Sequence, residues 1–402
     1  MTTLKQNSKD KQPVVLFQCS PSLGALDSWL SVLKVLRSKL PNVHFIFLSS
    51  KLGTIDQVYL ESDLIKISEE IFDSIVFRSD SGIFLIVNTF SEAKKLNISS
   101  RIKVFHYGRR VLNKFKLKFL EKFIHLPYKV VISSMYSNNI FKISSLKSLN
   151  YVTLFDIYEL TKPYNKDLYT TVSSSQNFSI LHGTGLTGIQ TNLDYKLKEV
   201  SQKANTANST AYLFSNNEIP FYEEYYSLTS EQIKVYGIPK HEKQWVEDLA
   251  SRKTIRKDGR YIFIISRPTN EYITTERRIE FLEMIKKIAI KYQLEVVVKL
   301  HPKELKSKLY KQVFDSDEDG IEWGLSIEHP FTLGMHCEFA ISYYSGVPLD
   351  LLSLGVPTIE LSNFIGIDHD DHEHSLRNCR GEAVREYRYL NLVLGASTYD
   401  EF

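Results

Sequence analysis

Two short segments in the second half of the chain carry residues that could bind a phosphate. The first, residues 296–304, is a run of valines that leads to Lys299 and then to His301 and Pro302. The apolar run predicts a buried strand, so His301 should emerge at the carboxyl edge of a sheet, where Pro302 ends ladder pairing. An imidazole in that place could donate a hydrogen bond to a phosphate or stabilise the charge of a leaving group. A histidine after a strand is also a common structural feature.

The second segment, residues 339–360, predicts a strand that ends at Ser342, a turn of small residues, and a helix from about residue 349. This order would place free backbone N–H groups and the positive end of a helix dipole at the strand's end, where they suit a phosphate. Ser345 adds a hydroxyl donor, and Gly346 permits close approach of an anion to the backbone. A plain strand–turn–helix connection without a ligand is the alternative interpretation.

A third candidate lies in the first half of the chain, where a strand end leads into a glycine-rich loop at residues 180–188. The ordinary pKa of a histidine, near ~6.5, suits His182 to deprotonating the hydroxyl of an acceptor. A nearby carboxylate, Asp156 or Glu159, could take the same part. The loop backbone is free to approach an acceptor at Gly183, Thr184 and Gly185. A structural histidine in a flexible turn is the competing interpretation of His182.

Basic residues gather near residues 103–123. His106 and Arg109 follow a predicted strand and could meet an anionic acceptor, although solvated surface positions are an equal alternative. The helix predicted over residues 110–123 mixes four lysines with aliphatic and aromatic residues. Such a helix could rest on an anionic membrane surface, and packing against its own domain is the commoner explanation.

The run at residues 368–374, D-H-D-D-H-E-H, has the composition of a metal site. Its spacing is that of an acidic loop, and no separate cluster of ligands supports it. We therefore expect neither a metal site nor a bound cofactor.

The elements that must position these residues alternate between strand and helix. Residues 14–48 predict a strand, a helix and a second strand, which is a βαβ unit and implies a parallel sheet. Further strands are expected at 83–87, 103–106, 129–132, 179–181, 211–214 and 234–236. The pattern restarts after a charged linker, residues 251–260, with strands at 261–265, 294–300, 339–341 and 358–361 and a helix at 276–292. This order predicts two α/β domains, at residues 1–240 and 241–402, with ligands beyond the carboxyl ends of the strands.

Composition narrows the class of protein. A chain of 402 residues is long enough for two cores, and its 43% hydrophobic and 24% charged residues are those of a folded protein. A net charge of +3 gives no reason to expect nucleic acid as a partner. Three dispersed cysteines predict a reducing compartment. The polar first twelve residues do not resemble a signal peptide, and no apolar run has the length of a membrane span, so a cytoplasmic location is expected.

The two phosphate-binding candidates together resemble the C-terminal half of the CDP-glycerol glycerophosphotransferases of teichoic-acid synthesis. That family has an H-P motif, then D-Y-S-S-x-x-x-D, then G-K-P before a strand. The chain matches it at His301-Pro302, at Tyr344-Ser345 and at Asp350, while Tyr343 replaces the first Asp and Gly346 the second Ser. The family's H-G-T motif, which carries the candidate general base, is similar to His182-Gly183-Thr184.

The resemblance implies a GT-B-like fold, in which two Rossmann-like domains face a cleft. It implies that His301, Ser345 and Gly346 hold the donor's phosphates and that Asp350 orients the site or binds a donor hydroxyl, with Lys299 and Pro302 beside them. The implied activity is transfer from a cytidine-linked donor, such as a CMP-sugar, to a glycan or lipid-linked acceptor in surface polysaccharide assembly. The expected location then extends to the surface of the inner membrane.

Other functions stay open. Glycerophosphotransfer from CDP-glycerol is one alternative. UDP-sugar 2-epimerases share the GT-B fold, but their S-G-G-x-x-E-E pattern is changed here at the second Gly and at both acids. A non-catalytic scaffold of polysaccharide assembly is the third. The acidic-acidic-Gly motif of bacterial CMP-sialic acid transferases is similar to residues 317–320, but it follows the H-P motif here rather than preceding it, so we interpret it as a surface turn.

Overall fold

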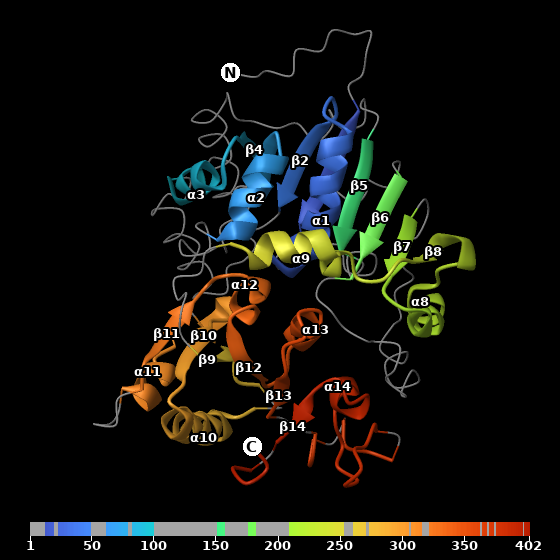
Figure 1. The fold of residues 1–402 in the computed structure, drawn as a ribbon. Helices are drawn as coiled ribbons and strands as arrows, with labels where there is room; N and C mark the ends of the chain where they lie inside the picture. The colour runs from blue at the N-terminus through green and yellow to red at the C-terminus, as the bar shows by residue number, and fades with distance from the viewer. Residues whose placement is uncertain are drawn as a thin grey trace, which may run out of the picture. The chain divides into compact units, whose positions relative to one another are not determined.

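The computed structural model describes residues 13–19, 23–49, 62–78, 83–99, 151–156, 176–181, 209–252, 260–270, 273–304, 307–315, 321–361, 364–367, 370–373, 375–396 and 398–402. These residues belong to two compact units (Figure 1), and the chain enters the second unit for the last time at Val235. The segment 214–225 also belongs to the second unit.

The first unit is built on an eight-stranded sheet in the order β4-β3-β2-β1-β5-β6-β7-β8. Neighbouring strands from β3 through β7 pair in parallel, whereas β4 pairs antiparallel with β3. The strands are β1 Val14–Cys19, β2 His44–Ser49, β3 Ser74–Arg78, β4 Phe84–Val87, β5 Tyr151–Asp156, β6 Gln176–Ile180, β7 Ser209–Leu213 and β8 Ile233–Val235.

Every residue of β1 is buried, as expected for a central parallel strand with both faces covered. Helix α1, Leu23–Lys39, packs on β1, β5 and β6, and the Trp29 indole N–H donates to the Phe155 carbonyl oxygen at 3.0 Å. Helix α2, Asp63–Ile71, packs on α1, and α3, Phe90–Ser99, packs on β3 and β4. The Trp29 bond therefore ties α1 to the carboxyl end of β5.

The second unit has a six-stranded sheet in the order β11-β10-β9-β12-β13-β14, with all neighbours parallel. Its strands are β9 Tyr261–Ile265, β10 Glu295–Lys299, β11 Trp323–Ser326, β12 Cys337–Ser342, β13 Thr358–Glu360 and β14 Leu394–Gly395. Its α-helices are α8 Ile219–Tyr226, α9 Lys243–Ala250, α10 Thr275–Tyr292, α11 Leu309–Phe314, α12 Pro330–Gly334, α13 Val347–Leu352 and α14 Glu386–Tyr389.

Alternate residues of β9 enter two separate cores, because successive side chains of a strand point to opposite faces. Ile262 and Ile264 pack with α10 and α11 on one face. Tyr261, Phe263 and Ile265 pack with residues of α12 and α13 on the other. The sheet is therefore a middle layer between two layers of helices.

The expectation of an α/β protein with two parallel sheets is confirmed. Strand β9 has the predicted bounds, and β10, β12, β13 and α10 lie within two residues of theirs. Helix α13 begins at Val347, before the predicted start at residue 349, because Pro348 in the first turn has a φ compatible with a helix and needs no N–H partner there. The strands expected at 103–106 and 129–132 lie outside the described residues.

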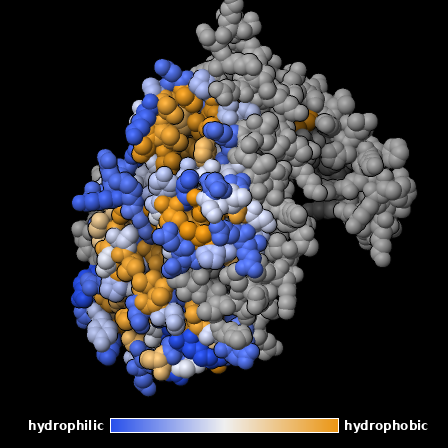
Figure 2. Space-filling model, turned by 90° about the vertical axis from the view of Figure 1, so that its right-hand side faces the viewer, coloured by the Kyte–Doolittle hydropathy of each residue, from blue (hydrophilic) through white to orange (hydrophobic). Residues whose placement is uncertain are grey.

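In the part of the chain that the structure describes, none of the helices is both long enough and apolar enough to cross a membrane. The face shown in Figure 2 carries separate apolar areas, in orange, divided by hydrophilic ones. The exposed large apolar side chains are spread over many elements, and the most exposed are Tyr236 and Leu394.

Candidate functional site

The strand order of the second unit reverses between β9 and β12. The chain runs from β9 outward through β10 to β11, and then returns to the other side of β9 with β12, β13 and β14. In open parallel sheets the crevice at such a reversal, beyond the carboxyl ends of the strands, is where ligands bind. Here that position is formed by the residues after Ile265 and after Ser342.

Arg267 and Tyr344 meet at this reversal. The Arg267 guanidinium carbon lies 4.9 Å from the centroid of the Tyr344 ring, which is within the range of a cation–π contact. Both side chains are half-buried. The two loops that flank the reversal are thus joined by a contact that also brings a positive charge to the sheet edge.

His301 follows β10, the strand next to β9, and is half-buried. Its Nδ1 accepts the backbone N–H of Lys303 at 3.1 Å, so in the neutral ring the proton is on Nε2, which is a donor. Burial, with the nearby charges of Arg267, Lys303 and Lys299, lowers the pKa of His301 to about 4. The imidazole is therefore neutral at pH 7 and can offer one N–H to an anion.

A buried network supports the turn that carries His301. The backbone N–H of His301 donates to Ser266 Oγ at 3.3 Å, and the Ser266 hydroxyl donates to the carboxylate of Glu304. Glu304 pairs with Arg278 of α10 at 2.6 Å, and Arg278 also donates to the Tyr310 hydroxyl at 2.8 Å. Side-chain exposures of 3% for Arg278 and 5% for Glu304 show that this pair is internal.

The turn after β12 holds Ser345 and Gly346. The Ser345 hydroxyl oxygen accepts the N–H of Val347 at 3.2 Å, which leaves its hydroxyl hydrogen available to donate. Gly346 has φ −81° and ψ −14°, a conformation open to any residue. The lack of a side chain at Gly346 therefore matters only if something approaches the backbone closely. Helix α13 has only six residues, so its dipole would contribute less to phosphate binding than the sequence predicts.

Lys299 and Asp350 are engaged within the protein. The Lys299 ammonium donates to the carbonyl oxygens of Ile327 and Glu328, at 3.4 and 2.7 Å. One oxygen of Asp350 accepts from the Lys240 ammonium and the other meets Nε2 of His241, both at 2.8 Å. These contacts fit residues that position the edge, and direct contact of Lys299 or Asp350 with a donor stays a prediction. Pro302 begins a short 3-10 helix, Pro302–Glu304.

The first unit has its own reversal of strand order, between β1 and β5. Asp156 is the last residue of β5, is paired in register with Ile180, and is 2% exposed. It thus lies at the same topological position in its sheet as Arg267 and Tyr344 do in theirs. The other predicted residues of this domain lie outside the described residues: His106, Arg109, Glu159, His182, Gly183, Thr184 and Gly185.

The described residues contain no group of three or more side chains that could hold a metal ion. Within the acidic run 368–374, the described Asp371 accepts the N–H of Gly366 at 3.0 Å and pairs with Arg377 at 2.9 Å. Residues 317–320 lie outside the described part of the chain.

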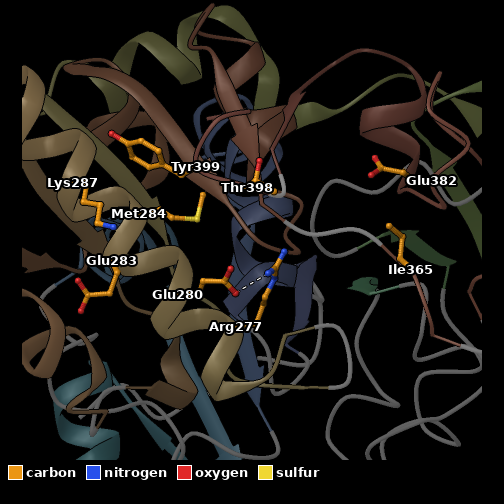
Figure 3. A pocket seen from close by; sticks show the side chains of 9 residues that line it. All are labelled: Arg277, Glu280, Glu283, Met284, Lys287, Ile365, Glu382, Thr398 and Tyr399. Carbon is orange, nitrogen blue, oxygen red and sulfur yellow. Dashed lines mark hydrogen bonds and ion pairs between the residues drawn. The ribbon is translucent and has the colours of Figure 1, made fainter.

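A cavity of about 690 Å³ lies along α10 and is shown in Figure 3. Arg277 and Glu280 of α10 line it and pair with each other at 2.7 Å. Lys287, Glu382 and Tyr399 add one positive, one negative and one aromatic side chain. The cavity includes none of the predicted site residues, and its mixed charges do not select a ligand class.

Two residues near the predicted site, Arg267 and Arg385, were not predicted. Arg267 had a signal, because Ser-Arg-Pro follows the buried strand β9 much as His-Pro follows β10. Arg385 lies far along the chain, and its guanidinium carbon is 4.2 Å from the Tyr344 ring centroid. No local pattern marks a residue that reaches a turn 40 positions earlier.

No protein-family model matches the chain, and no curated protein matches it either. Several solved structures match most of its length, at TM-scores below 0.5. UDP-GlcNAc 2-epimerase from Methanocaldococcus jannaschii is 13% identical, with 97% of this chain and 90% of that chain covered and a TM-score of 0.48. The wall teichoic acid polymerase TagF is 10% identical, with 96% and 76% covered and a TM-score of 0.45. The glycotransferase of kitacinnamycin is 8% identical, with 97% and 88% covered and a TM-score of 0.44. Likeness at this level carries no conclusion about activity.

Proposed function

We propose that the chain is a glycosyltransferase of bacterial surface polysaccharide assembly that takes its sugar from a nucleotide-activated, cytidine-linked donor. The observation that carries the proposal is the carboxyl edge of the second sheet. Arg267 and Ser345 follow the two strands at the strand-order reversal, and His301 follows the neighbouring strand β10, so a guanidinium, a neutral imidazole and a hydroxyl donor come from loops at the same edge of the sheet. Hydrogen-bond donors and a positive charge suit the phosphates of a nucleotide.

In this proposal the second domain, residues 241–402, binds the donor. As the bond between sugar and phosphate breaks, negative charge grows on the departing phosphate. Nε2 of His301, the Ser345 hydroxyl and Arg267 would stabilise that charge, and donors already in place need little reorganisation during the reaction. Gly346 would allow the phosphate to approach the backbone.

The first domain, residues 1–240, would bind the acceptor. His182 would take the proton of the attacking hydroxyl, with Asp156 or Glu159 as the other candidate bases. His106, Arg109, Gly183, Thr184 and Gly185 would contact the acceptor. Of these residues, Asp156 lies in the described part of the chain. Its position at the strand-order reversal of its sheet supports this part of the proposal.

A thermal-shift screen against CMP, CDP, UDP, GDP and ADP tests the donor part of the proposal. A ligand that binds only the folded state at a hundredfold excess over its Kd adds about 2.7 kcal/mol of apparent stability. We expect CMP or CDP to raise the Tm and Arg267→Met or His301→Ala to abolish the shift. Arg260→Met is the matched control, because Arg260 precedes the other end of β9 and pairs with Glu338 on the surface at 2.7 Å. A Tm shift with UDP alone would mean that the donor is linked to uridine rather than to cytidine.

Product analysis separates the remaining alternatives. Incubation with CDP-glycerol, CMP-linked sugars or UDP-GlcNAc, followed by NMR of the nucleotide products, distinguishes sugar transfer, glycerophosphotransfer and 2-epimerisation. A protein that shifts with no nucleotide and forms no product would be a scaffold, and the proposal would fail.

The proposed location is the cytoplasm, with contact to the inner membrane through residues 110–123. Sedimentation with vesicles of anionic lipid checks this contact. We expect binding that falls at high salt and on replacement of the four lysines of that segment, whereas vesicles of neutral lipid should leave the protein in the supernatant. Equal sedimentation with both kinds of vesicle would contradict an electrostatic contact.

A further inference from the structure

Arg385 lies against the turn that follows β12. Its guanidinium carbon is 4.2 Å from the centroid of the Tyr344 ring, and its Nη1 donates to the Ser345 carbonyl oxygen at 3.1 Å. One side chain therefore touches two consecutive residues of the turn, one by stacking and one by a hydrogen bond.

The guanidinium is itself anchored. Its Nη1 lies 3.5 Å from a carboxylate oxygen of Glu360, at the end of β13, and its Nη2 lies 3.1 Å from a carboxylate oxygen of Glu386. Arg385 also rests on the ring of Tyr387, at 4.6 Å from its centroid. A planar group held by two carboxylates and two rings has little freedom to move, so it can serve as a rigid support.

The turn is thus held from several sides. Tyr344 contacts the guanidinium groups of both Arg267 and Arg385, and its ring lies 6.0 Å from that of Phe364. The carbonyl oxygen of Ser345 is bonded to Arg385, and its hydroxyl oxygen to the N–H of Val347. These bonds leave the hydroxyl hydrogen of Ser345 as the group that can still donate.

We propose that Arg385 is a positioning residue, which holds Tyr344 and Ser345 in the arrangement that accepts the phosphates of the donor. The inference rests on the proposed function for its ligand. With only 9% of its side chain exposed, Arg385 offers little surface to a phosphate, so it acts through the turn rather than by direct contact. It also gives the C-terminal segment around α14 a part in donor binding.

Three variants test this role: Arg385→Met, Arg385→Lys and the matched control Arg388→Met. Arg388 lies in α14, which Arg385 directly precedes; it is buried to a similar extent and pairs with Glu382 at 3.8 Å. The Kd values of CMP, CDP and UDP are measured in parallel by calorimetry. We expect Arg385→Met to weaken binding of the tighter-binding nucleotide by about tenfold, the size of loss that follows when partners that orient metal ligands are removed. Arg385→Lys should recover only part of this loss, because an ammonium cannot stack in the same way.

A second measurement needs no ligand. Deuterium exchange of the amides of residues 344–347 should be faster in Arg385→Met than in the wild type, and unchanged in Arg388→Met. If the wild type binds no nucleotide, the proposed function fails, while the exchange data still decide whether Arg385 holds the turn. Unchanged exchange in Arg385→Met would overturn the inference, as would an equal loss of nucleotide affinity in Arg385→Met and Arg388→Met.

Discussion

Two buried carboxylate–arginine pairs support the two sides of the strand-order reversal in the second unit. They differ in how close the donors lie to each carboxylate. On the β9–β10 side, Glu304 pairs with Arg278 at 2.6 Å and also accepts from Ser266. On the β12–β13 side, Glu360 lies 3.5 Å from Arg385, which it shares with Glu386. In the described part of the structure one oxygen of each carboxylate, Oε1 of Glu304 and Oε2 of Glu360, has no hydrogen-bond partner, but Oε1 of Glu304 lies 2.6 Å from Arg278.

The charge state of Glu360 reflects this difference. Complete burial, with a smaller contribution from Glu386, raises the pKa of Glu360 to about 7, although the charges of Arg385 and Arg388 oppose the shift. Burial favours the protonated form of a carboxylate, and close donors or positive charges oppose it. Glu304 thus lies in a close ion pair with Arg278, whereas Glu360 gains or loses its proton near neutral pH.

The largest loss of stability is expected when the closer pair, Glu304 with Arg278, is broken. Glu304→Ala would leave the Arg278 guanidinium buried without its carboxylate, which typically destabilises a protein by about 3–5 kcal/mol. Urea unfolding measures the change. Glu280→Ala removes the exposed partner of Arg277 and should cost about 0–1 kcal/mol. Similar losses in the two variants would mean that the Glu304 pair contributes no more than a surface one.

The Glu360 side is tested by the dependence of stability on pH. The pKa of Glu360 is raised from 4.5 in the unfolded chain to about 7, so its contribution is present below about pH 4.5 and is lost as the pH rises through about 7. The loss should be on the order of 3 kcal/mol, since each pKa unit corresponds to about 1.4 kcal/mol. Glu360→Gln should remove this part of the profile. Parallel profiles for the wild type and Glu360→Gln would show that Glu360 ionises as readily in the folded protein as in the unfolded chain.

His301 lies on the Glu304 side of the reversal. The smallest expected effect is on the protonation of its imidazole. Because its pKa is lowered to about 4, its imidazole should show no protonation step near ~6.5, the ordinary value for histidine. NMR of labelled histidines checks this, and the same residue in urea should titrate normally. A step near ~6.5 in the folded protein would mean that His301 is charged in weak acid and binds anions as a cation.

Much of the second sheet could be predicted from the sequence, because β9 is an unbroken apolar run and β10 has three consecutive valines, which suit parallel strands buried on both faces. Strand β5 was not predicted, since its Thr153 and Asp156 interrupt the apolar pattern, although both are buried. His301 and Ser345 could be singled out because each lies within three residues of the end of a strand. The support given by Arg385 could not, since it depends on how a distant segment packs against the turn.

The pair formed by Asp350 with Lys240 and His241 has a mechanical consequence. The chain enters the second unit for the last time at Val235, and a few residues later Lys240 and His241 bond to Asp350 of α13, the helix after the Ser345 turn. Tension along the chain from the first unit would therefore reach this short helix before most of the second sheet. In a pulling experiment, α13 and its turn would be among the first parts of the second unit to carry the load.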